Sequence, residues 1–279
     1  MPETRALVLA GGGVTGIAWE LGLVVGLSRQ DVDVTAADLI LGTSAGSTVG
    51  AQIASGVPLT ELQAAQLADE TSEITVDLDV DEFRARLAGL VADAPDPQAA
   101  RARVGRMALE AKTVPEAVRR RAIEARLPVH EWPAQRLVVT AVDAATGELA
   151  LLDRDAGVPL VDAVAASCAV PGVWPPVTID GRRYVDGGAR SLANADLAAG
   201  HDRVLVVVPM ALEGPYREQL DAELAILAET GKTRVIAADD ASLAAIGPNP
   251  LDPSRRAAAY RAGSAQGEAA AAGVAEFWR

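Results

Sequence analysis

The chain is poor in cysteine, histidine and aromatic side chains. Its 279 residues include one cysteine, Cys168, so no disulfide can form within the chain and nothing indicates an oxidising compartment. The two histidines, His130 and His201, lie far apart in the sequence and form no cluster with the cysteine of the kind that binds a transition metal. We therefore expect neither a metal ion nor another cofactor.

Long apolar runs and an excess of basic charge are also missing. No uninterrupted apolar stretch approaches the roughly 20 residues of a membrane span, and the first residues do not resemble a signal peptide, so we expect a soluble, cytoplasmic protein. Lys and Arg total 25 against 38 Asp and Glu, a net charge of −13 that argues against nucleic acid as a partner. Seven arginines between residues 101 and 126 leave transient contact with a membrane surface open, beside the simpler interpretation of a solvated helix face.

The first 55 residues repeat one pattern, a short apolar strand that runs through a glycine-rich turn into a helix. Residues 6–10 and 14–27 form the first pair, and residues 38–41 and 47–54 form the second. Such repeats are typical of a doubly wound sheet whose strands are mostly parallel. With 50% hydrophobic residues in the chain, the pattern predicts one three-layer α/β/α domain over residues 1–279.

Residues 58–133 break this pattern, because they contain several helical stretches and no convincing strand. We interpret them as a helical insertion within the domain. Strand character then resumes at residues 137–144, 148–153, 177–179, 183–185, 204–208 and 234–237, with helices predicted at 161–168, 219–230 and 254–277.

Ser44 lies in Gly42-Thr43-Ser44-Ala45-Gly46, between the second strand and its helix. A Gly-x-Ser-x-Gly turn in this context can present a serine hydroxyl as a nucleophile, because the flanking glycines keep other side chains away from it. The motif alone is ambiguous, since a turn where a helix and a strand pack closely uses the same small residues.

The glycine run Gly11-Gly12-Gly13-Val14-Thr15-Gly16 follows the first strand and allows two interpretations. It satisfies a dinucleotide-binding fingerprint, but the second strand ends without the acidic residue that would bind a ribose. Alternatively, the amides of Gly12 and Gly13 stabilise an oxyanion beside Ser44, with help from the dipole of the following helix. A nucleotide-binding module that uses Gly11–Gly16 remains the alternative to a hydrolase.

The general base is the remaining question. His201 precedes a strand whereas Ser44 follows one, so a parallel sheet would place them at opposite edges, and His130 lies where the insertion rejoins the sheet. Asp186 ends an apolar hairpin strand directly before Gly187 and Gly188. A carboxylate is a weak base, but it can serve if it forms a hydrogen bond with the Ser44 hydroxyl and takes the proton during attack.

These blocks, together with Ala166–Gly172 (Ala-Ser-Cys-Ala-Val-Pro-Gly), occur in the order found in the patatin-like phospholipases, which the chain closely resembles. The resemblance implies a lipid acyl hydrolase with Ser44 as nucleophile, Asp186 as base and no catalytic histidine. It also implies an oxyanion hole at Gly11, Gly12, Gly13 and Ala45, with motif glycines at Gly16, Gly42, Gly46, Gly187 and Gly188. The expected substrates are phospholipids or lysophospholipids, with neutral esters and thioesters left open, and a lipid-binding regulatory protein with little turnover is a further alternative.

Overall fold

A single mixed sheet forms the centre of the computed structural model, which describes residues 3–279. The strand order is β5-β6-β3-β2-β1-β7-β8, and β4 pairs with β3 off this path. The strands are β1 Arg5–Leu9, β2 Leu39–Gly42, β3 Leu137–Asp143, β4 Leu149–Leu152, β5 Val177–Ile179, β6 Arg182–Asp186, β7 Arg203–Val208 and β8 Lys232–Ala237.

The strands β3, β2, β1, β7 and β8 are parallel, which confirms the predicted mostly parallel sheet. β4 and β6 both pair antiparallel with β3, and β5 pairs antiparallel with β6. The β5–β6 hairpin turns at Asp180 and Gly181, both with positive φ, as the Asp-Gly sequence predicts. The strands at one end of the sheet therefore do not all run in the same direction as the parallel strands, and one of them, β6, carries Asp186.

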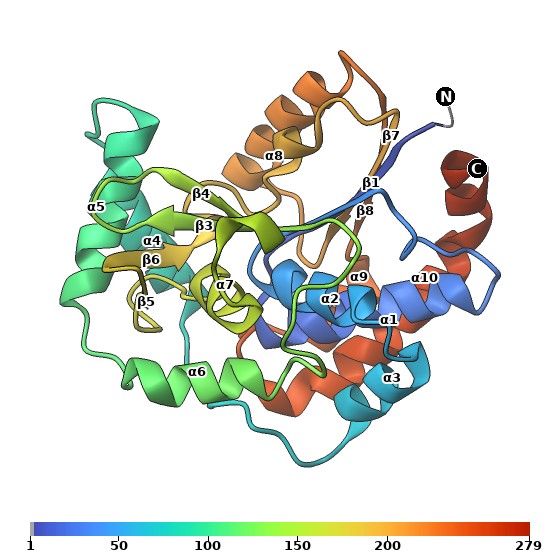
Figure 1. Ribbon diagram of the computed structural model, residues 1–279, viewed down its shortest axis with the longest axis horizontal. Helices are drawn as coiled ribbons and strands as arrows, with labels where there is room; N and C mark the ends of the chain where they lie inside the picture. The colour runs from blue at the N-terminus through green and yellow to red at the C-terminus, as the bar shows by residue number, and fades with distance from the viewer. Residues whose placement is uncertain (1–2) are drawn as a thin grey trace.

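Both faces of the sheet are buried, which explains why its central strands are apolar without alternation. Successive residues of β3 still point to opposite faces, so Val139 joins one core cluster and Val138 another. The helices α1 (Gly13–Ser28), α2 (Ala45–Ala54), α7 (Leu160–Ser167) and α10 (Arg256–Trp278) cover the first face, and α8 (Gly214–Leu227) covers the second. Figure 1 shows α8 on the opposite side of the sheet from α1, α2 and α10.

The helix α1 is buried along nearly its whole length, because α10 packs along its outer side. A side chain at Gly22 would collide with the backbone of Tyr260, and one at Gly263 would collide with the backbone of Trp19. Glycine at these positions lets the two helix backbones approach closely. This pairing forms most of the outer layer on that face, so the three-layer α/β/α prediction is confirmed.

The segment 58–133 is helical, as predicted, with α3 Leu59–Leu67, α4 Val80–Val91, α5 Pro97–Glu110 and α6 Glu116–Glu124 and no strand. Asp79 and Asp96 cap α4 and α5 with hydrogen bonds to the amides of Glu82 and Ala99. Figure 1 places α4, α5 and α6 together beside the β5–β6 end of the sheet.

Two details of the sequence interpretation were wrong. α8 begins at Gly214 rather than at residue 219, and the short helix α9 (Asp240–Ile246) follows β8 in a stretch that was given no helix. The glycine and proline at the start of α8 hid its first turn, although proline suits that position because its missing amide has no partner there.

The arginines of the insertion also differ from a plain solvated helix face. Arg126 forms two hydrogen bonds of 2.7 Å with the Glu73 carboxylate, and both side chains are buried. Arg119 is buried as well, with its guanidinium carbon 3.9 Å from the centre of the Trp174 ring. Arg119 therefore holds the insertion against the rest of the domain, and Arg126 joins two parts of the insertion, so neither side chain faces solvent.

Candidate active site

Ser44 lies in a strained turn between β2 and α2. Its backbone angles are φ 52° and ψ −113°, in a region that residues other than glycine seldom adopt. A side chain at Gly46 would collide with the backbone of Leu9, and one at Gly42 with the backbone of Ser47, so both motif glycines are required by close approach. The turn has the form of the nucleophile elbow that the sequence predicts.

The end of α7 supports this turn from below. The Ser44 amide donates to the Ser167 hydroxyl at 2.9 Å, and the Cys168 thiol donates to the Ser44 carbonyl at 3.3 Å. Burial raises the pKa of Cys168, so the thiol keeps the proton that it donates. In the sequence this segment is recognisable only as a motif, whereas in the structure it contacts the strained residue itself.

Asp186 reaches the same part of the sheet from the opposite direction. The pairing of β2 with β3 ends at Gly42 opposite Val139, two residues before Ser44. The antiparallel strand β6 ends with Asp186 opposite Ala141, two residues beyond Val139. β4 pairs with residues 139–142 along the other edge of β3, so β2 and β6 share one edge and meet there end to end. Ser44 and Asp186 therefore lie at the same level of the sheet, on the same side of β3.

The Asp186 carboxyl is buried and has one free oxygen. Oδ1 accepts a hydrogen bond of 2.8 Å from the Gly188 amide, while Oδ2 has no partner among residues 3–279. Burial raises the pKa of Asp186 to about 7, and the Gly188 amide, the Ser44 hydroxyl and the Arg119 guanidinium all act to lower it. The carboxyl therefore changes charge near neutral pH, where a general base works best.

The direct hydrogen bond expected between the Ser44 hydroxyl and the Asp186 carboxylate is not formed with ordinary geometry among the described residues. The hydroxyl is nevertheless close enough to lower the pKa of Asp186. Catalytic hydrogen bonds are commonly long or poorly aligned in unliganded sites.

The glycine run forms the rim beside Ser44. Gly13, with φ 65°, begins α1, and a side chain there would collide with the carbonyl of Pro250. Among residues 3–279, no acceptor takes a hydrogen bond from the amides of Gly12, Gly13 or Ala45. The Gly11 amide donates to the Leu192 carbonyl at 2.8 Å, so this amide is already occupied.

A cavity of about 420 Å³ opens over these groups. Its floor includes Ser44, Asp186 and Gly11–Gly13, and apolar side chains dominate its walls. Phe83 and its neighbours from the insertion form one wall, and residues around α9 form another. Two further lining residues meet across the cavity, since the guanidinium carbon of Arg84 on α4 lies 5.1 Å from the centre of the Tyr216 ring on α8.

Neither histidine reaches this cavity. β7 is parallel to β1, and His201 precedes it at the opposite edge of the sheet, where its ring contacts the Ala198 carbonyl at 2.9 Å. His130 is exposed beside Glu124. Trp174, close to Asp186 in the sequence, is buried against Arg119 and does not line the cavity. Arg119 was missed as an influence on Asp186, because nothing in the sequence indicates that this arginine turns inward.

Within residues 3–279, no group of three or more His, Cys, Asp or Glu side chains is arranged to hold a metal ion. None of the helices in the same part of the chain combines the length and the apolar character needed to cross a membrane.

Fold and site together define an α/β protein with a serine elbow, a buried carboxyl and a glycine-rich rim on one cavity. The model of the family described as Patatin-like phospholipase matches residues 7–199, so the chain belongs to this family. Family membership supports a lipid hydrolase. Comparison with curated protein sequences gives no match.

Two solved structures resemble the chain at low sequence identity. VipD from Legionella pneumophila is 14% identical with a TM-score of 0.44, and the match covers 96% of this chain and 67% of VipD. The type III effector protein ExoU is 18% identical with a TM-score of 0.38, and the match covers 96% of this chain and about half (53%) of ExoU.

Proposed function

We propose that the protein is a serine esterase that hydrolyses acyl esters of lipids through Ser44 and Asp186. The observation that carries the proposal is the buried Asp186 carboxyl, which has a free oxygen and a pKa of about 7 and opens on the same cavity as Ser44. Membership of a phospholipase family supports the lipid substrate.

The reaction proceeds in two steps. Ser44 Oγ attacks the ester carbonyl carbon while the Asp186 carboxylate takes the hydroxyl proton, and the amides of Gly12, Gly13 and Ala45 stabilise the oxyanion. The protonated Asp186 then gives its proton to the departing alcohol, which leaves an acyl-serine. Water attacks this acyl-serine as Asp186 accepts a proton from it, and collapse releases the fatty acid and returns the proton to Ser44.

The walls of the cavity suit an acyl chain. Leu78, Val80 and Phe83 on one side and Leu243 and Ile246 on the other offer an apolar surface, while the reacting carbonyl meets polar groups only at the floor. Phospholipid or lysophospholipid is the proposed substrate class, and the same geometry accommodates a neutral ester or a thioester.

The test compares Ser44→Ala and Asp186→Asn with the wild type on p-nitrophenyl octanoate and on a lysophospholipid. We expect kcat to fall by about a thousandfold or more in both variants, because each loses a reacting group, and both should still unfold in one cooperative melting transition. Normal activity in Asp186→Asn together with loss in His130→Ala would contradict the dyad.

Labelling with a fluorophosphonate separates the alternatives. An active serine is labelled in the wild type and not in Ser44→Ala. A wild type that resists labelling, hydrolyses no ester and shifts its melting temperature with NAD or ATP would instead be a nucleotide-binding module. Binding of lipid without labelling or hydrolysis would indicate a lipid-binding protein with little turnover.

A further inference from the structure

The segment that follows Asp186 contacts every part of the site. Asp186 begins it, the Leu192 carbonyl accepts the Gly11 amide at 2.8 Å, and Asn194 near its end reaches back beneath the elbow. These contacts connect the base, the glycine run and the nucleophile turn through one short piece of chain.

Asn194 is fully buried, and its side-chain amide contacts the residues that follow β2 and β6. The two protons of Nδ2 serve three acceptors, one of them shared: Thr43 Oγ1 at 3.1 Å, the Gly187 carbonyl at 3.3 Å and the Ser191 carbonyl at 2.6 Å. Thr43 directly precedes Ser44, and Gly187 directly follows Asp186. One amide group therefore contacts the main chain next to the base and the side chain next to the nucleophile.

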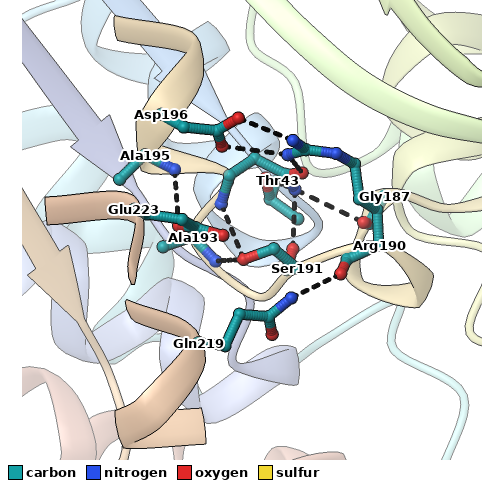
Figure 2. A network of polar contacts seen from close by, with 10 residues as sticks. Thr43, Gly187, Arg190, Ser191, Ala193, Ala195, Asp196, Gln219 and Glu223 are labelled. Atoms are coloured by element: carbon teal, nitrogen blue, oxygen red, sulfur yellow. Dashed lines mark hydrogen bonds and ion pairs between the residues drawn. The ribbon is translucent and has the colours of Figure 1, made fainter. Parts of the chain in front are cut away.

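A second layer fixes the orientation of this amide. Arg190 donates to Asn194 Oδ1 at 2.7 Å, and since arginine only donates, the oxygen of Asn194 must face it and the nitrogen must face Thr43. Arg190 is itself held by two hydrogen bonds to Asp196, at 3.0 and 2.6 Å. Figure 2 shows these contacts, with Gln219 at the outer edge, where its amide donates to the Arg190 carbonyl.

The backbone conformation at position 194 also favours asparagine over most other residues. Its φ of 51° is left-handed, a conformation that asparagine tolerates better than most residues. The Thr43 hydroxyl, which accepts from Asn194, can donate its own proton to Thr140 Oγ1 on β3 at 2.8 Å. The chain of contacts thus crosses from the end of β6 through Asn194 and Thr43 to β3.

We propose that Asn194 is a positioning residue that sets the distance between Ser44 and Asp186. The inference rests on the proposed function, because that distance matters only if the two residues react together. In a dyad the base contacts the nucleophile directly, without an intervening histidine. The main-chain segments that carry Ser44 and Asp186 must therefore be held at a fixed separation by other contacts. Asn194 does this through Thr43 on one side and Gly187 on the other.

A matched pair of substitutions at Thr43 tests this contact. Thr43→Val keeps the shape and removes the hydroxyl that accepts from Asn194, whereas Thr43→Ser keeps the hydroxyl and removes a methyl group. We expect kcat for p-nitrophenyl octanoate to fall between about tenfold and a hundredfold in Thr43→Val, with KM within about twofold, because a displacement near 1 Å has this effect on a reacting pair. Thr43→Ser and the control Gln219→Ala, at the outer edge of the network, should remain near the wild type.

Equal activity in Thr43→Val and Thr43→Ser would overturn the proposal, as would a change confined to KM. Amide hydrogen exchange of Asn194→Ala gives a readout that does not depend on hydrolysis. We expect faster exchange in peptides covering 42–48 and 186–192 and unchanged exchange in 232–237. Unchanged exchange in the first two peptides would overturn the proposal even if the protein hydrolysed no ester, and an inactive wild type with the expected exchange would refute only the proposed function.

Discussion

Ser44 donates its amide proton to the hydroxyl of Ser167 across 2.9 Å, and both residues are buried. The contact matters because the Ser44 backbone is strained and its amide lies outside the hydrogen bonds of α2. Two residues along, the Ala169 carbonyl accepts the Asp186 amide at 3.0 Å. The end of α7 therefore holds the main chains of both Ser44 and Asp186.

Ser167→Ala should slow catalysis and weaken the fold. The change leaves the buried Ser44 amide without an acceptor, which costs about 1–3 kcal/mol of unfolding free energy and lets the strained turn relax. We expect kcat to fall about tenfold with little change in KM, measured on p-nitrophenyl octanoate, and a lower midpoint in urea.

Ser47→Ala is a matched control for that variant. Its hydroxyl bonds to the Ser44 carbonyl at 2.6 Å, but the Ser47 amide also donates to that carbonyl, at 3.0 Å. Removing this hydroxyl therefore leaves no Ser44 group without a partner. If Ser47→Ala lost as much activity as Ser167→Ala, the special role of the Ser44 amide would be refuted.

The pH dependence of kcat/KM should follow Asp186. Burial raises the pKa of Asp186 to about 7, and the carboxyl must be ionised to accept the Ser44 proton. Activity should therefore be low near pH 5.5, rise through pH 7 and level off above about pH 8. A neutral ester whose own hydrolysis is subtracted at each pH is the appropriate substrate, and a flat profile over this range would exclude Asp186 as the titrating base.

Arg119→Met should move that profile to higher pH. The Arg119 guanidinium lowers the pKa of Asp186, so its removal raises that pKa and leaves less carboxylate at a given pH. Burial and the neighbouring Arg126 lower the pKa of Arg119 to about 9, which still leaves it charged at pH 7. The expected result is a larger loss of kcat/KM at pH 6 than at pH 8.

Arg121→Met controls for the loss of one positive charge from the same helix. Arg121 is exposed, so solvent screens its charge. The profile of this variant should match that of the wild type. A shift of the same size in both variants would mean that net charge, rather than the buried guanidinium, sets the pKa of Asp186.

Much of the fold could be predicted because its signals are local. The strands before Gly11 and Gly42 are short apolar runs that end in glycines, and the insertion contains helical patterns without a strand. The exclusion of His201 also followed from the sequence, because a residue before a parallel strand cannot meet one that follows its neighbour. These predictions needed only the period of the apolar residues and the position of the turns.

The relations that complete the site could not be predicted in this way. The meeting of Ser44 and Asp186 depends on β6 running antiparallel beside β3, and a strand's direction in a sheet is a long-range property. Likewise, the inward turn of Arg119 depends on its contact with Trp174, which is 55 positions away in the sequence but adjacent in the folded chain. The engagement of the Gly11 amide by Leu192 is of the same kind, so the sequence could not separate Gly11 from Gly12 and Gly13.

Glu20 provides a test of the fold that does not involve the site. Its carboxyl is buried in α1, neither oxygen has a hydrogen-bond partner among residues 3–279, and burial raises its pKa well above the ordinary value. In the unfolded chain a glutamate ionises near pH 4.3, so above that pH unfolding releases a proton that the folded state retains. The ionisation of Glu20 should therefore lower the free energy of unfolding of the protein as the pH rises, by at most about 1.4 kcal/mol per pH unit.

Glu20→Gln removes this titration while keeping the shape of the side chain. The melting temperature of Glu20→Gln minus that of the wild type should be small near pH 5 and clearly positive at pH 8, by several degrees. The exposed Glu218→Gln on α8 controls for the general loss of a negative charge and should show no such pH dependence. A difference that stayed constant from pH 5 to pH 8 would mean that Glu20 does not keep its proton in the folded protein.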